Sequence, residues 1–144
     1  MLSLLIEQEI VKNFMNNLFK NDCFDLFQLK TIEITASHFV SITEPDNNNI
    51  DKTLWSNIRP LILNLLKHVT KPTRVKIVFS YPNVLDIHAN LKSGFINILY
   101  GSDTANITTG TSEAKFTLDK SHEAAWDAWV IEFFKKNDLG VVVE

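Results

Sequence analysis

The sequence predicts an α+β fold in which three helices pack against a mainly antiparallel sheet of about five or six strands. Three observations predict it. Apolar residues recur at helical spacing in three segments, they alternate with polar residues in several others, and the last third contains short alternating runs separated by turns. At 144 residues without an internal repeat or linker, the chain is expected to be a single domain, residues 1–144.

The first half contains two predicted helices and one long alternating segment. Residues 6–20 and 51–69 carry apolar side chains at helical spacing, and Pro60 is tolerable in the second helix only near its start. Residues 26–43 alternate with a period of two over more than the length of an ordinary strand. We therefore expect a bend near Ser37, or two strands with a tight junction, followed by an exposed loop at 45–49.

The second half begins with an expected strand at 75–81, whereas residues 84–93 are ambiguous and fit a short helix. Three short runs then predict a C-terminal β-meander followed by a helix. The runs are residues 95–100, 104–109 and 113–118, separated by turns at 101–103 and 110–112.

The last of these runs is expected to turn Ala114, Phe116 and Leu118 toward the core. Asp119 or Ser121 is expected to cap the final helix, because short polar side chains satisfy the free N–H groups of a first turn. The apolar side of that helix carries Trp126, Trp129, Val130, Phe133 and Phe134.

Composition excludes several classes of protein. A net charge of −3 with scattered basic residues argues against binding nucleic acid through phosphate neutralisation. The single cysteine, Cys23, cannot form an internal disulfide and is expected to be a small buried or half-buried apolar residue. The apolar residues 1–6 lack a basic flank, and no run approaches the ~18 apolar residues of a membrane span, so we expect a cytoplasmic protein without a membrane partner.

Several motifs together resemble an uncharacterised family of Gram-positive (Firmicutes) bacterial proteins, known as a domain of unknown function. The resemblance extends over nearly the whole chain and carries no activity, cofactor or catalytic residue. It implies a small cytoplasmic bacterial protein, and the loop at 43–47 departs from the family pattern. The motifs are LWSNIRP at 54–60, TTGTS at 108–112, FTLDKS at 116–121, and Trp126-Asp127.

Trp55, Arg59 and Trp129 are candidate binding residues on the helices. Arg59 follows Trp55 by four residues, so its guanidinium is able to lie over the indole and bind an anionic or planar ligand. The alternative, which we favour, is that Arg59 locks the start of the helix to the sheet. Trp129 lies at the edge of an aromatic stripe that is otherwise typical of a core.

A second candidate contact surface is the solvent-facing side of the meander. Its polar residues include the candidate binding residues Thr111 and Ser112, with Thr108, Glu113 and Lys115 beside them. The segment around Ser112 resembles a nucleophile elbow, but an elbow needs a helix directly after the turn, and a strand is expected there. A hairpin turn at Gly110 is the favoured interpretation.

The four histidines show no metal-binding spacing, so neither a metal nor a cofactor is expected. His122 begins a sequence like the zinc motif H-E-x-x-H, but Trp126 stands where the second histidine is required. His38 is expected to be a hydrogen-bonded core or rim residue, and His122 to be solvated in the first turn of its helix.

Our preferred hypothesis is a non-enzymatic binding or regulatory module, because no nucleophile, base and orienting group can be assembled from motif spacing. The alternative is a small hydrolase or transferase whose site joins distant residues, such as Ser112, His122 or Asp127 with Arg59. Homodimerisation is a further hypothesis, since the edges of an antiparallel sheet must be covered.

Overall fold

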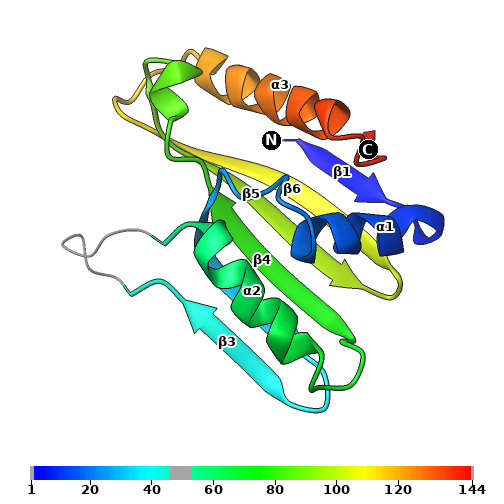
Figure 1. Cartoon of the computed structure of the whole chain (residues 1–144). Coiled ribbons are helices and arrows are strands. Elements are labelled where there is room, and N and C mark those ends of the chain that lie inside the picture. The colour runs from blue at the N-terminus through cyan, green and yellow to red at the C-terminus, as the bar shows by residue number, and fades with distance from the viewer. Residues whose placement is uncertain (1, 46–52, 144) are drawn as a thin grey trace.

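The computed structural model describes residues 2–45 and 53–143, and within them the chain forms a seven-stranded sheet and three α-helices (Figure 1). All strand pairs are antiparallel, and the order is β3-β2-β4-β5-β6-β1-β7. The strands are β1 (Ser3–Ile6), β2 (Gln28–Thr35), β3 (Phe39–Thr43), β4 (Arg74–Ser80), β5 (Leu91–Gly101), β6 (Thr104–Glu113) and β7 (Val142–Val143). The helices are α1 (Gln8–Phe19), α2 (Trp55–Leu66) and α3 (Ser121–Lys136), and a short 3-10 helix, η1 (Val84–Asp86), precedes β5. The predicted α+β class is confirmed.

Short connections explain much of the strand order. β2 and β3 form a hairpin through residues 36–38, which confirms the tight junction expected near Ser37. β4, β5 and β6 form a meander that α3 follows, but only β5 and β6 correspond to predicted runs of the meander, those at 95–100 and 104–109. The β5–β6 turn has positive φ at Ser102 (53°) and Asp103 (63°), as in the type I′ turns that suit the twist of a hairpin.

The helices cover one face of the sheet, and alternation along the strands separates that face from an open one. A row of register partners, at most 1% exposed, crosses five strands on the covered face: Ile32, Ile77, Ile98, Ile107 and Leu4. Each such buried aliphatic side chain stabilises the fold by roughly 1.5–3 kcal/mol relative to exposure. The open face carries half-buried and exposed residues between them.

Two short strands at the chain ends were not predicted. β1 pairs with β6 and β7 pairs with β1, so the two ends of the described chain lie side by side at one edge of the sheet (Figure 1). The helix expected over 6–20 is confirmed as α1, which begins at Gln8. The mostly apolar residues before it, Ser3–Ile6, form a strand. In β1, Leu4 and Ile6 are fully buried.

The expected strand at 113–118 and the turn before it are wrong. β6 continues without a turn through Gly110 to Glu113, and the chain then leaves the sheet. The side chain of Asn90 holds it there, accepting the N–H of Lys115 (3.0 Å) and donating to its carbonyl (3.1 Å). Without a partner strand, the alternation has no core to face, and Phe116 and Leu118 are 81% and 87% exposed.

The second predicted helix is confirmed but is shorter than residues 51–69. It begins at Trp55, whose N–H donates to the carbonyl of Phe27 (2.9 Å), and it ends at Leu66. Pro60 is the sixth helical residue, and its ring is exposed while the helix continues past it. Apart from Pro45, the loop expected at 45–49 lies outside the described residues, as does the start at 51–52.

No helix in the described part of the chain is long and apolar enough to cross a membrane.

Candidate functional site

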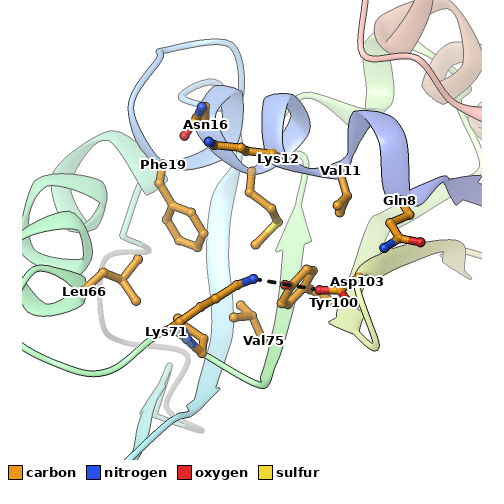
Figure 2. Close-up of a pocket in the computed structure, with 12 residues that line it drawn as sticks. Gln8, Val11, Lys12, Asn16, Phe19, Leu66, Lys71, Val75, Tyr100 and Asp103 are labelled. Carbon is orange, nitrogen blue, oxygen red and sulfur yellow. Dashed lines mark ion pairs between the residues drawn. The ribbon is translucent and has the colours of Figure 1, made fainter.

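A pocket of about 690 Å³ lies where α1 and α2 face the ends of β4 and β5 (Figure 2). Its volume is within the roughly 300–1,000 Å³ of ordinary ligand sites. Most of its wall is apolar. The lining residues are Gln8, Val11, Lys12, Met15, Asn16, Phe19, Leu66, Lys71, Pro72, Val75, Tyr100 and Asp103.

The apolar wall follows from the periodicity of the elements that form it. Val11, Met15 and Phe19 are spaced by four along α1 and therefore share one side of the helix. Val75 and Tyr100 are register partners in β4 and β5 and both turn to the covered face. Of these, Met15 alone is half-buried, and the others are at most 9% exposed. The apolar side chains of this wall are therefore held in place by the fold itself.

The rim of the pocket carries the charges. Lys12 projects from the wall formed by α1, and Lys71 extends toward Asp103 of the β5–β6 turn (Figure 2). The Lys71 Nζ to Asp103 Oδ1 distance is 3.9 Å, and the two side chains are 80% and 56% exposed. Such an exposed ion pair contributes at most about 1 kcal/mol and separates readily.

Trp55 lies in the core and Arg59 beside it makes an ion pair. Trp55 is fully buried, and its indole N–H donates to the carbonyl of Leu18 (3.2 Å). The Arg59 guanidinium donates two hydrogen bonds of 2.9 Å to the carboxylate of Asp25. This carboxylate raises the pKa of the guanidinium above its ordinary value. The pair is structural, but it ties α2 to the segment that follows α1 and not to the sheet, as the favoured interpretation had expected.

Trp129 lies at the edge of an aromatic cluster beside a second pocket, of about 590 Å³. It is half-buried, and its ring lies nearly parallel to those of Trp126 and Phe133, at centroid distances of 5.3 and 5.6 Å. Tyr81 adds a tilted contact at 4.5 Å. These three neighbouring rings already cover much of the Trp129 indole. Little of its aromatic surface is therefore free to contact a ligand in this pocket.

Cys23 lines the same pocket and is half-buried. Burial is the main cause that raises the pKa of its thiol to about 11, which disfavours the reactive thiolate.

Thr111 and Ser112 lie within β6 rather than in a turn. Thr111 pairs with the buried Gly94 and turns toward α3, whereas Ser112 pairs with Ser93 and turns to the open face. Thr108 also lies on the open face, beside Asn97. The expected polar surface is therefore divided between the two sides of the sheet.

Residues proposed for the enzyme alternative do not converge. Ser112 and Glu113 point to opposite faces, and the carboxylate of Glu113 lies 3.6 Å from His122 Nε2 on the covered side. Asp127 accepts a hydrogen bond from Thr109 Oγ1, and Arg59 binds Asp25. No nucleophile and base among them are within hydrogen-bond reach of each other in the described contacts.

Two histidine predictions are wrong. His122 is 2% exposed instead of solvated, because it packs under the end of β6 beside Glu113. His38 is exposed in the β2–β3 turn instead of lying on a core or rim position. Among the described residues, no three His, Cys, Asp or Glu side chains are placed to hold a metal ion together.

His88 and Ser121 form a hydrogen-bonded chain that has a structural explanation. The N–H of Asn90 donates to His88 Nδ1 (3.0 Å), so Nε2 carries the proton and donates to Ser121 Oγ (3.1 Å), whose hydroxyl donates to Asp119 (3.1 Å). The histidine is thus a donor to the serine and not its base. Asp119 also accepts the N–H of Ser121 (2.9 Å), but the N-cap residue of α3 is Lys120, so the expectation that Asp119 or Ser121 caps this helix is wrong.

None of the five candidate binding residues lines the pocket between α1 and α2. Sequence periodicity places Val11 and Met15 on the apolar side of their helix, and they do lie there. No local sequence pattern indicates that α1 and α2 leave a space between them above Val75 and Tyr100.

A model of a family of unknown function, DUF5721, matches residues 17–141 of the chain. Comparisons with curated proteins and with solved structures found no match.

Proposed function

The chain belongs to the DUF5721 family of unknown function, and we propose from its own geometry that it is a non-enzymatic binding protein whose ligand occupies the α1–α2 pocket. One observation carries the proposal: a preformed pocket of about 690 Å³ with a mostly apolar wall and a few polar groups at its rim. That combination is typical of small-molecule sites, in which apolar surface supplies affinity and polar groups orient the ligand.

The wall supports binding more than it supports structure. Phe19 and Val75 are already buried by their neighbours in the fold, so the volume above them is not needed for their own packing. The pocket is open to solvent at its rim, so an apolar ligand that occupies it would displace water from the apolar wall, which is favourable.

The test is titration of the protein with N-phenyl-1-naphthylamine, a neutral apolar dye that fluoresces on leaving water. The wild type is expected to bind one equivalent. Met15→Trp places a larger ring in the pocket and is expected to weaken binding at least tenfold. Asn13→Trp is the matched control, because Asn13 is an exposed residue of the same helix outside the lining. Circular dichroism checks that both variants fold.

Absence of dye binding by the wild type, or equal binding by the Met15→Trp and wild-type proteins, would overturn the proposal.

We also propose that the protein works in the cytoplasm of a Gram-positive bacterium. The motif resemblance supports this, and so does the single cysteine of the sequence, which cannot form the internal disulfides typical of exported proteins. Fractionation of such a host that produces the native chain should recover it with cytoplasmic markers, and recovery from the culture fluid would contradict the proposal.

A further inference from the structure

We infer that the ligand of the α1–α2 pocket is an amphipathic carboxylate, with an unbranched acyl chain along the apolar wall and its carboxylate at the rim between Lys12 and Lys71. This inference rests on the proposed function and adds the chemical class of the ligand.

The pocket follows the whole length of α1, which indicates an elongated ligand. Its lining begins at Gln8, the first residue of the helix, and ends at Phe19, the last. Eleven residue steps at a rise of 1.5 Å correspond to roughly 16 Å. An extended hydrocarbon chain fits such a groove, and the flexible thioether of Met15 in the middle of the wall adapts to it.

The charges at the rim favour an anion. Two ammonium groups, Lys12 and Lys71, and one carboxylate, Asp103, line the pocket, so the rim has a net charge of +1. The chain as a whole carries −3, and the local excess of positive charge is therefore opposite in sign to that of the molecule.

Both lysines are available to a ligand. Lys71 is held only by the exposed 3.9 Å pair with Asp103, and Lys12 makes no ion pair or side-chain hydrogen bond with the described residues. Figure 2 shows the Lys71 side chain extending toward Asp103, with Val75 and Tyr100 nearby. A carboxylate at this position would exchange a weak pair for charge-assisted hydrogen bonds without leaving a buried charge unpaired.

The experiment measures binding of octanoate, decanoate and dodecanoate to the full chain by calorimetry, with dodecan-1-ol and dodecyltrimethylammonium as head-group controls. Affinity is expected to rise about fourfold for each added CH₂ while the chain remains within the groove. Dodecanoate is expected to bind at least tenfold more tightly than the alcohol, and the cation is expected to bind least.

Removal of the rim charges tests the head group separately. The double variant Lys12→Gln with Lys71→Gln is expected to lose about 10- to 100-fold in affinity for dodecanoate while its affinity for N-phenyl-1-naphthylamine is unchanged. Lys76→Gln with Lys135→Gln removes the same charge from exposed positions outside the pocket and is the matched control.

Failure of this inference is distinguishable from failure of the proposed function. If the neutral dye binds and Met15→Trp blocks it, but dodecanoate shows no advantage over the alcohol or no dependence on the two lysines, the carboxylate inference is overturned and the binding pocket stands. If neither the dye nor any acyl compound binds, both are overturned.

Discussion

Replacement of Gly94 by alanine tests the packing of α3 on the sheet. A Cβ at this position would lie 2.8–2.9 Å from three ring atoms of Trp126. Carbon atoms at rest are about 3.5–4.0 Å apart, so the ring would have to retreat by about 0.6 Å or more. It has no room to do so, since Trp126 is fully buried and Trp129 stacks in parallel at 5.3 Å.

The magnitude follows from three contributions. Overpacking of a core costs about 1–3 kcal/mol, and displacement of the ring also weakens the hydrogen bond from Trp126 Nε1 to the carbonyl of Phe95 (3.1 Å), worth about 1 kcal/mol. The smaller entropy of unfolded alanine offsets about 0.4–1 kcal/mol. We therefore expect Gly94→Ala to lower the free energy of unfolding by about 1–3 kcal/mol, or Tm by about 2–4 °C per kcal/mol.

The assay is equilibrium unfolding in urea, followed by tryptophan fluorescence and by circular dichroism. Gly110→Ala is the matched control, because it lies on the adjacent strand and its added Cβ would meet its nearest atoms at an ordinary 3.9 Å. That variant is expected to be as stable as the wild type or slightly more so. Trp126→Phe in the Gly94→Ala background should recover part of the loss, as a double-mutant cycle measures. Equal stability of the two alanine variants would refute the reasoning.

Three further predictions concern other parts of the fold. Arg59→Met should lower the free energy of unfolding by about 1.5–3 kcal/mol, and Asp25→Asn should add little in the same chain, since both remove one bidentate pair; additive losses in urea unfolding would contradict this. Phe116→Ser with Leu118→Ser should change stability by less than about 0.5 kcal/mol, because both side chains are exposed; a loss above 2 kcal/mol in the same assay would show that they are buried. Burial raises the pKa of Cys23 to about 11, above its ordinary value of 9.0, so the folded state binds the proton more tightly and stability should fall as pH rises from about 9 to 11. At pH 8, its reaction with a thiol reagent should be about 100-fold slower than in urea, and equal rates would contradict the burial.

Several elements were predictable because their signal is local. The apolar spacing in α1, α2 and α3, and the alternation in β2 and β4, depend on which residues share a face, and this follows directly from helical and strand geometry. The tight junction near Ser37 and the turn at Ser102 and Asp103 were predictable for the same reason.

Other elements depend on partners far away in the chain. Residues 3–6 are a strand because β6 supplies hydrogen-bonding partners, whereas residues 114–118 alternate in the same way and remain outside the sheet because Asn90 holds their backbone elsewhere. Alternation states which residues would share a face, but pairing decides whether a sheet exists for them. The burial of His122 likewise depends on a residue of another element, because it packs beside Glu113 at the end of β6.

By itself, then, the sequence determined the α+β class, the three helices and the hairpin of β5 and β6. Only the tertiary structure decided where the chain leaves a pocket, because Val11, Val75 and Tyr100 each satisfy their own local pattern as core residues. Whether such residues meet one another or border a space depends on how far α1 and α2 diverge above β4 and β5. That divergence results from the packing of elements distant in sequence, and no local spacing of residues encodes it.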